Sequence, residues 1–333
     1  MTTGESGLVV AVTGPTGTLG FGLIPLLEAD ERVQRVVGIA RRPFDPLEHG
    51  WTKLEYRRGD VRDPEALAQA FAGADVVVHL AFLVVGGARA ATHAINVEGT
   101  LNAFRAAANA GARRFVYASS VSAYGFHTDN PVPMSEDWPT RPADRLSYAQ
   151  DKAELEQLLR EEARQHPDVA LYLLRPPIVL GPHAMGAKAV GPGSLSALGG
   201  ALMRAAGRLH APVLVPDLSL QFVHEEDVGR ALLQCVVAAG PPGAYNVAAD
   251  DVMTVADVAR EVGVVPLPVP AALTRPAARL VMRSPVLPPV AQWVEVLTHP
   301  AIMDTALAKD ELGWVPVHTA RDAVRETLRS GQS

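Results

Sequence analysis

A tyrosine and a lysine four residues apart, Tyr148 and Lys152, begin a stretch with amphipathic helical spacing. On a helix, residues i and i+4 share one face, so the phenol and the ammonium group are neighbours. A nearby cation favours the ionised form of a phenol, whose reference pKa is about 10, and so favours acid/base chemistry near neutral pH. A solvated surface pair is the alternative interpretation.

A serine pair, Ser119 and Ser120, closes a run of strand-forming residues that begins at Arg114. In an open α/β sheet, the carboxyl ends of the strands build the site. We therefore expect Ser120, 28 residues before Tyr148, to join the Tyr/Lys pair.

A glycine-rich turn, Thr13-Gly14-Pro15-Thr16-Gly17-Thr18-Leu19-Gly20, connects an expected strand to an expected helix. Glycines at such a turn permit a tight bend, close backbone approach to a pyrophosphate, and close helix packing, while the helix N-terminus faces the phosphates. A purely structural glycine turn is the alternative.

The first half of the chain alternates β-branched runs with longer helical patterns, which predicts a doubly wound parallel (Rossmann) α/β sheet. The expected strands are Leu8 to Thr13, Val33 to Ala40, Leu54 to Tyr56, Asp75 to Ala81, Arg114 to Ser119 and Ala170 to Leu174. The expected helices are Leu19 to Ala29, Pro64 to Phe71, Thr92 to Ala110 and Ser147 to Gln165.

After Pro176 the chain becomes rich in Pro and Gly, which indicates a smaller, loop-rich C-terminal substrate domain. We expect residues 1–180 to form the nucleotide-binding domain, with a return segment at about 214–240. Residues 181–213 and 241–333 are expected to form a lid.

Composition narrows the function classes. The 333 residues are 48% apolar and 20% charged, with a net charge of −6 and no basic run longer than a pair, which argues against nucleic-acid and membrane partners. No apolar stretch reaches the roughly 20 residues of a membrane span, and the N-terminus lacks a secretion signal, so a cytoplasmic protein is expected. The single cysteine, Cys235, excludes internal disulfides and a Cys-based zinc site, and we expect a core thiol and no metal.

The glycine turn, the Tyr148-x-x-x-Lys152 pair and several further strings match one family. The chain resembles an extended short-chain dehydrogenase/reductase of the NAD-dependent epimerase/dehydratase type over nearly its whole length. The further matching strings are Gly59-Asp60-Val61, His79-Leu80-Ala81, Asn96-Val97-Glu98-Gly99-Thr100, Tyr117-Ala118-Ser119-Ser120, Ala123-Tyr124-Gly125, Leu174-Arg175-Pro176, Phe222-Val223-His224-Glu225-Glu226-Asp227-Val228, Tyr245-Asn246-Val247 and Leu312-Gly313-Trp314-Val315-Pro316.

The resemblance implies a role for each matching position. Tyr148 is the catalytic acid/base, Lys152 lowers its pKa and holds the nicotinamide ribose, and Ser120 polarises the substrate. Geometry predicts the substrate contacts: Ser120 and Tyr148 must reach one carbonyl oxygen, and the chain after Pro176 leaves the sheet on that side. The expected contacts are Ser122, Tyr124, Pro177 and Ile178, with the segment from His183 to Gly193. His79 is expected to be structural. The remaining expected cofactor contacts are Gly14, Thr16, Gly17, Thr18, Leu19, Gly20, Asp60, Val61, Leu80, Ala81, Phe82, Asn96, Ala118, Pro176 and Ile178.

Arg41 and Arg42 follow the second expected strand, where a carboxylate would bind the ribose 2′-hydroxyl of NAD. Two guanidinium groups suit the 2′-phosphate of NADP instead. NADP is therefore the expected cofactor, with NAD and a solvated arginine pair as the alternatives.

The expected function is an NAD(P)-dependent oxidoreductase acting on a small carbonyl or alcohol substrate. Ile178 and Leu220 stand where nucleotide-sugar epimerases of the family carry an Asn and an Arg, which weakens the diphosphate-sugar interpretation. A nucleotide-sugar epimerase or dehydratase with tightly held cofactor is the first alternative. A non-catalytic cofactor-sensing protein is the second, disfavoured because Ser120, Tyr148 and Lys152 are all present. The family also implies a homodimer.

Overall fold

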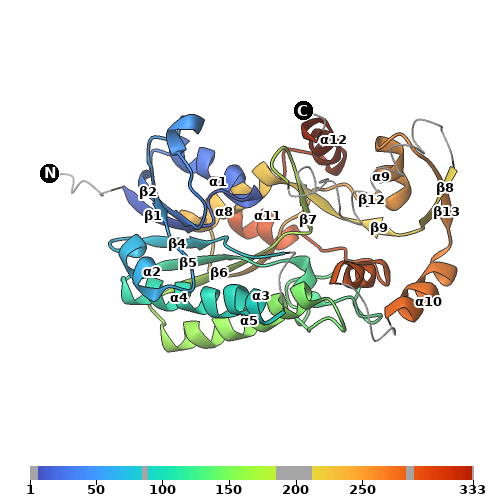
Figure 1. The fold of residues 1–333 in the computed structure, drawn as a ribbon, viewed down its shortest axis with the longest axis horizontal. Helices are drawn as coiled ribbons and strands as arrows, with labels where there is room; N and C mark the ends of the chain where they lie inside the picture. The colour runs from blue at the N-terminus through green and yellow to red at the C-terminus, as the bar shows by residue number, and fades with distance from the viewer. Residues whose placement is uncertain (1–6, 85–88, 185–211, 283–288, 332–333) are drawn as a thin grey trace.

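A seven-stranded parallel sheet forms the centre of the computed structural model, which describes residues 7–84, 89–184, 212–282 and 289–331 (Figure 1). The strand order is β11-β6-β5-β4-β1-β2-β3, and every pair is parallel. The doubly wound Rossmann fold is thereby confirmed. The strands are β1 (Leu8–Thr13), β2 (Val33–Ala40), β3 (Leu54–Arg58), β4 (Val76–His79), β5 (Arg114–Ala118), β6 (Ala170–Arg175) and β11 (Gly243–Asn246).

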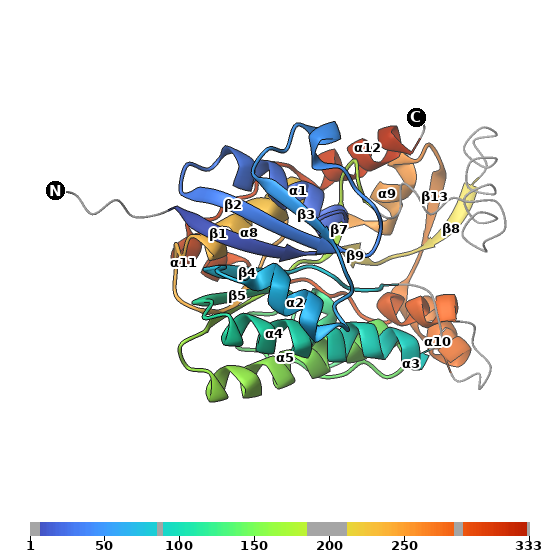
Figure 2. The same ribbon diagram turned by 60° about the vertical axis from the view of Figure 1, so that its left-hand side comes forward.

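Helices cover both faces of the sheet (Figure 2). One face carries α2 (Pro64–Phe71), α4 (Gly99–Asn109) and α5 (Ser147–Gln165), and the other carries α1 (Thr18–Ala29), α8 (Glu225–Val236) and α11 (Ala306–Leu312). Successive residues of β1 pack into the hydrophobic cores on opposite faces of the sheet. Val10 and Val12 pack with α1 and α8, whereas Ala11 packs with α2 and α4. This period of two is what a sheet covered on both faces requires.

The helix expected at Thr92 to Ala110 is interrupted. The chain forms α3 (Arg89–His93), one π-helical turn, η2 (Ala94–Glu98), and then α4. The Thr100 hydroxyl, at the start of α4, donates to the carbonyl oxygen of Asn96 in this turn at 2.5 Å, and the Asn96 side chain is fully buried. The other expected elements keep their positions, with ends that shift by at most two residues.

A second group of elements adjoins the sheet at its carboxyl edge. Three two-stranded sheets pair β7 (Ile178–Leu180) with β10 (Phe222–His224), β9 (Ser219–Leu220) with β12 (Met253–Thr254), and β8 (Pro212–Pro216) with β13 (Val265–Val269). The helical segments of this group are α9 (Val255–Glu261), α10 (Ala271–Met282), η4 (Pro289–Leu297) and α12 (Ala320–Ser330). Two short helices of the first half, η1 (Pro46–His49) and η3 (Val121–Tyr124), pack against β3 and α5.

The return to the main sheet extends further than expected. Strand β11 pairs with β6, and α11 packs against α8 and β11, although both elements fall within the residues 241–333 assigned to the lid. The preceding Gly240-Pro241-Pro242-Gly243 turn suggests a loop, and a four-residue strand gives too short a pattern to outweigh that signal.

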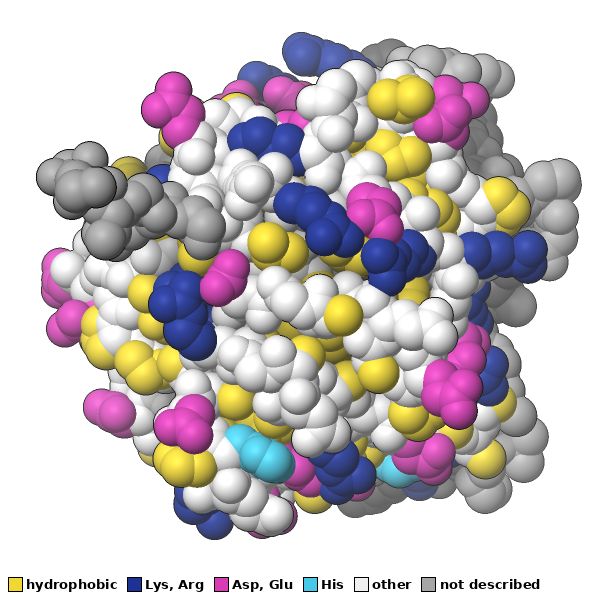
Figure 3. All heavy atoms as spheres, turned by 90° about the vertical axis from the view of Figure 1, so that its left-hand side faces the viewer, with side chains coloured by type: hydrophobic (Ala, Val, Ile, Leu, Met, Phe, Trp, Pro, Cys, Tyr) yellow, Lys and Arg dark blue, Asp and Glu magenta, His cyan; other side chains and the backbone are white. Residues whose placement is uncertain are grey.

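Acidic and basic side chains are interspersed on the face shown in Figure 3, as the modest net charge leads one to expect. Cys235 is fully buried in the core around α8, which confirms the expected core thiol. Within the described ranges, the helices are too short or too polar to cross a membrane.

Candidate active site

The glycine turn lies at the switch point of the sheet, between the carboxyl ends of β1 and β4, where the order of the strands reverses. Gly14 has φ +69°, and a Cβ there would stand 2.9 Å from the backbone nitrogen of Ala81. A Cβ on Gly20 would stand 2.1 Å from the carbonyl oxygen of Pro15. Both positions therefore require glycine, one for its backbone conformation and both for close approach.

Helix α1 begins at this turn without a side-chain cap at Gly17 and without an acidic residue in its first turn. Its first backbone N–H groups are consequently free of local carboxylates and suit an anion. The turn therefore fits the pyrophosphate of a dinucleotide.

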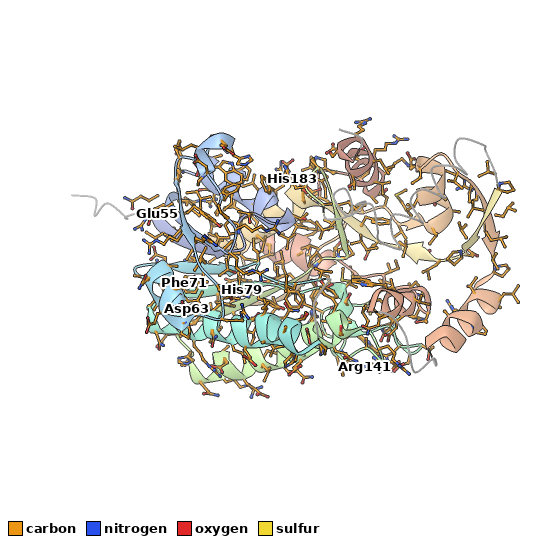
Figure 4. All side chains as sticks on the ribbon, in the orientation of Figure 1. Glu55, Asp63, Phe71, His79, Arg141 and His183 are labelled. Atoms are coloured by element: carbon orange, nitrogen blue, oxygen red, sulfur yellow. The ribbon has the colours of Figure 1, made fainter. Side chains whose placement is uncertain are left out.

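His183 lies over the start of α1, which the sequence did not indicate. Its carbonyl oxygen accepts from the Thr18 hydroxyl at 2.9 Å, and its ring stacks on Phe21 with centroids 4.1 Å apart. Its Nδ1 lies 2.5 Å from the Glu225 carboxylate at the start of α8. In Figure 4 His183 stands beside α1, between the main sheet and α12. Residues 185–193 of the expected substrate segment lie outside the described residues.

The expected adenosine-side residues gather at the same edge. Gly14 N–H donates to the carbonyl oxygen of Ile39 at 2.9 Å, Gly59 N–H donates to that of Ala40 at 3.0 Å, and the exposed Arg41 and Arg42 follow. The Asp60 carboxylate pairs with Arg62 at 2.8 Å, and this contact lowers its pKa.

His79 links the two strands that flank the switch point. Its Nδ1 is 2.9 Å from the Thr13 hydroxyl and its Nε2 is 3.0 Å from the Thr100 hydroxyl. Burial, followed by the charge of Lys152, lowers its pKa to about 3, so the ring is neutral at physiological pH. Figure 4 places it inside the sheet, consistent with the expected structural role.

The three expected catalytic side chains come together. Ser120 follows β5 and is the N-cap of η3, Tyr148 is the second residue of α5, and the Ser120 hydroxyl is close enough to the Tyr148 phenol to influence its pKa. Burial raises the pKa of Tyr148, and the Ser120 contact partly offsets this rise. The arrangement holds one phenol and one hydroxyl where both can reach a single substrate oxygen.

Lys152 points at the end of β5. Its Nζ donates to the carbonyl oxygen of Ala118 at 2.6 Å and to the Tyr117 hydroxyl at 3.0 Å, and lies 3.7 Å from the centroid of the Phe82 ring. Burial lowers its pKa to about 7. The centroid of the Tyr148 ring is 5.8 Å from Nζ, and burial dominates the Tyr148 pKa, so the expected lowering by Lys152 does not appear in this structure.

Tyr124 differs from its expected place. Its side chain is fully buried, and its hydroxyl contacts the carbonyl oxygen of Ser135 at 3.2 Å, the Asn246 side chain at 2.8 Å and the Arg175 guanidinium at 2.6 Å. Burial raises its pKa to about 12. Tyr124 therefore belongs to an internal polar network, and the expectation that it contacts substrate is wrong for this structure.

That network also anchors the catalytic helix. Arg175 donates to both oxygens of Glu156 on α5, at 2.8 and 2.6 Å, and Ser119 donates to the same carboxylate at 2.6 Å. Both charged side chains are almost completely buried. The ion pair ties the ends of β5 and β6 to the helix that carries Tyr148 and Lys152.

The remaining expected residues divide between the site and its support. Asn96 is a support: its side chain bonds the backbone of Leu83 at 2.8 and 3.1 Å and the buried Asp151 at 3.2 Å. Pro176 and Pro177 are buried, and Ile178 is 41% exposed at the start of β7. Buried or half-buried positions around the site are held by Thr16, Thr18, Leu19, Val61, Leu80, Ala81, Phe82, Ala118 and Ser122.

Several proteins of known or unknown function are similar to this chain. An uncharacterized protein of Mycobacterium tuberculosis is 28% identical over 328 residues, which cover 96% of this chain and 83% of that protein. A ceramide reductase of Caulobacter vibrioides is 31% identical over 228 residues, 68% of this chain and 60% of that protein. The N-acetyl-alpha-D-glucosaminyl-diphospho-ditrans,octacis-undecaprenol 4-epimerase of Escherichia coli O157:H7 is 34% identical over 175 residues, 52% of this chain and 49% of that protein.

Solved structures share the fold over almost the full length. The crystal structure of gox2253 superimposes with a TM-score of 0.76 at 25% identity, covering 97% of this chain and 98% of that one. A UDP-glucose 4-epimerase of Thermotoga maritima gives a TM-score of 0.72 at 19% identity, covering 98% and 99%. The model of the NAD dependent epimerase/dehydratase family matches residues 10–248, which include the glycine turn, Ser120, Tyr148 and Lys152. This chain belongs to the NAD-dependent epimerase/dehydratase family.

Proposed function

We propose that this protein is an NADP(H)-linked oxidoreductase that interconverts a carbonyl compound and its alcohol. The observation that carries the proposal is the meeting of Ser120, Tyr148 and Lys152 at the carboxyl end of β5, with β4 between them and the strand that leads into the glycine turn. A nicotinamide bound at this edge supplies or accepts the hydride.

The protein's own residues handle the proton and the substrate oxygen. Ser120 donates a hydrogen bond to that oxygen, and Tyr148 gives it a proton during reduction or removes one during oxidation. The Lys152 ammonium donates one N–H to the Ala118 carbonyl and one to the Tyr117 hydroxyl, and its third N–H is available for a ribose hydroxyl.

The choice of NADP over NAD rests on Arg41 and Arg42. Both side chains are exposed directly after β2, and no acidic residue stands beside them in the sequence to take the ribose hydroxyls. Guanidinium groups bind phosphate oxygens through charge-assisted hydrogen bonds.

The substrate is proposed to be uncharged and largely apolar. Rings of Phe82 and Trp293 flank Tyr148, with centroids 5.5 and 5.6 Å from its own. Ile178 and the half-buried Leu220 offer no partner for a diphosphate. The similarity to a ceramide reductase also supports an apolar substrate.

Net turnover of cofactor tests the proposal. Purified protein with NADPH and a panel of aliphatic, aromatic and long-chain ketones should consume nicotinamide absorbance in proportion to added ketone. Tyr148→Phe should remove that consumption. No net turnover with any carbonyl or alcohol, in either direction, would contradict the oxidoreductase function.

A sugar epimerase with tightly held cofactor is the second candidate, favoured by the similarity to the undecaprenol-linked 4-epimerase. In that reaction the hydride returns to the same substrate, so cofactor is not consumed. Micromolar, specific binding of a uridine or thymidine diphosphate sugar, with product formation at catalytic cofactor, would place this candidate first.

A further inference from the structure

Glu295 is a buried carboxylate that the proposed reaction does not use. It lies in η4 of the C-terminal part and is 3% exposed. Its two oxygens accept three backbone N–H groups, from Asp144 at 2.7 Å, Arg145 at 2.9 Å and Leu146 at 2.7 Å. These three residues directly precede the helix that carries Tyr148 and Lys152.

Helix α5 has no cap of its own. Its N-cap residue is Leu146, which has no side-chain acceptor, and its first turn contains no acidic residue. Gln292, also in η4, accepts from Ser147 N–H with its Oε1 at 3.3 Å. A segment about 150 positions further along the chain thus accepts the N–H groups of the three residues that lead into the helix and of its first residue.

The same segment contacts the catalytic ring. The Trp293 ring lies 5.6 Å from the Tyr148 ring, tilted by 31°, and Trp293 and Val296 pack with Leu146 and Ala149 at the start of α5. Phe82, which follows β4, meets the Tyr148 ring edge-on at 5.5 Å. Tyr148 is therefore held between one ring from the nucleotide-binding half and one from the C-terminal part.

We propose that two residues of η4 act on the active site. Glu295 is a positioning residue that fixes the start of α5. Trp293 is a specificity-determining residue that limits the size of the substrate group beside Tyr148. The inference rests on the proposed function for the identity of the reaction. The placement of Glu295 does not depend on which carbonyl compound reacts.

Glu295→Gln tests the positioning role. Glutamine keeps the size but turns an NH₂ group toward backbone donors, so at least one of the three N–H groups loses its acceptor. We expect kcat to fall about tenfold or more, while the Kd for NADPH stays within about twofold, because the glycine turn lies elsewhere and Lys152 keeps its own contacts with Ala118 and Tyr117. Hydrogen exchange of the amides of residues 144–150 should accelerate. Glu295→Asp, which keeps both oxygens, should recover part of kcat.

Glu261→Gln is the matched control. Glu261 is a carboxylate of the same C-terminal part, largely buried and paired with Arg321 and Arg325 at 2.9 and 2.8 Å. It should leave kcat and the exchange of residues 144–150 unchanged. Wild-type kcat and wild-type exchange in Glu295→Gln would overturn the inference.

Two further measurements test the positioning role if Glu295→Gln does not fold or if no turnover is found. If Glu295→Gln does not fold, Gln292→Ala removes only the acceptor of Ser147 N–H, and unchanged exchange at that amide overturns the inference. Because exchange and cofactor binding need no turnover, they also separate this inference from a failure of the proposed function.

Trp293→Ala tests the specificity role. The ratio of kcat/KM for a bulky ketone to that for a small one should rise at least about tenfold, with cofactor affinity unchanged. Trp138→Ala, in a different apolar cluster, should leave the ratio unchanged. An unaltered ratio in Trp293→Ala would remove Trp293 from the substrate wall.

Discussion

The buried ion pair between Arg175 and Glu156 gives a stability prediction that can be worked out from its contacts. The guanidinium donates to both carboxylate oxygens at 2.8 and 2.6 Å, and the two side chains are 2% and 0% exposed. Arg175→Met fills much of the same volume but leaves the carboxylate of Glu156 without its cation. The Ser119 hydroxyl would then be its remaining strong donor.

Removing one partner of a buried ion pair costs about 3–5 kcal/mol, because the other charge stays desolvated. With an unfolding entropy of about 2.1 cal/mol/K per residue scaled to the whole chain, this corresponds to a fall in Tm of about 4–7 °C. Arg160→Ala is the matched control. Arg160 also approaches Glu156, at 3.5 Å, but it is 45% exposed, so the expected cost is about 0–1 kcal/mol.

The pH dependence has a definite sign. Although burial opposes it, the contacts with Arg175 lower the pKa of Glu156 below its usual value of 4.5. A depressed carboxyl pKa contributes stability above that usual value, and the contribution is lost as the pH falls through the folded-state pKa. In Arg175→Met, burial without the Arg175 cation raises the Glu156 pKa, so protonation of Glu156 in acid removes the uncompensated buried charge. The difference in free energy of unfolding between variant and wild type should therefore narrow as the pH falls.

Urea denaturation of wild type, Arg175→Met and Arg160→Ala at about pH 7.5 and about pH 5 measures both effects. A cost below about 1 kcal/mol for Arg175→Met at the higher pH, or a gap that widens in acid, would refute the reasoning.

Three further predictions concern the cofactor and the substrate. NADPH should bind at least about tenfold more tightly than NADH, about 1.4 kcal/mol, and Arg41→Ala should abolish most of this difference in a fluorescence titration; equal affinities in wild type would argue against the arginine contact. Lys152→Ala should weaken cofactor binding and lower kcat together, since Lys152 meets both the end of β5 and the reaction site; wild-type Kd would contradict its ribose role. Ile178→Asn with Leu220→Arg should not improve the native reaction, because an uncharged, apolar substrate offers no partner to the added amide and guanidinium groups; faster turnover would indicate a diphosphate substrate.

The central sheet was predictable because its signals are local. Strands such as Leu8 to Thr13 are continuous β-branched runs, and Gly14 and Gly20 mark positions where a Cβ has no room. The meeting of Ser120, Tyr148 and Lys152 follows from the same logic, since parallel strands and their helices bring carboxyl-end residues to one edge.

The support around the site could not be predicted in the same way. Glu295 serves a helix whose start is about 150 residues away, and no local pattern links the two. Tyr124 matches a family string next to Ser120, yet tertiary contacts with Arg175 and Asn246 draw it into the interior. The π-helical turn at Asn96 likewise depends on partners from distant segments, Leu83 and Asp151.

The most direct test of the central claim is the rate of hydride transfer in Tyr148→Phe at saturating cofactor. The change deletes one hydroxyl and keeps the ring packed against Phe82 and Trp293, so cofactor affinity should stay within about twofold. Tyr172→Phe deletes a hydroxyl that donates to Gly240, on a side chain that packs in the core with α1 and α8 rather than with α5, and should keep wild-type turnover. We expect Tyr148→Phe to lose about 10²–10⁴-fold in rate, the contribution of a general acid/base. Retention of more than about a tenth of the wild-type rate would show that Tyr148 is not the acid/base of this enzyme.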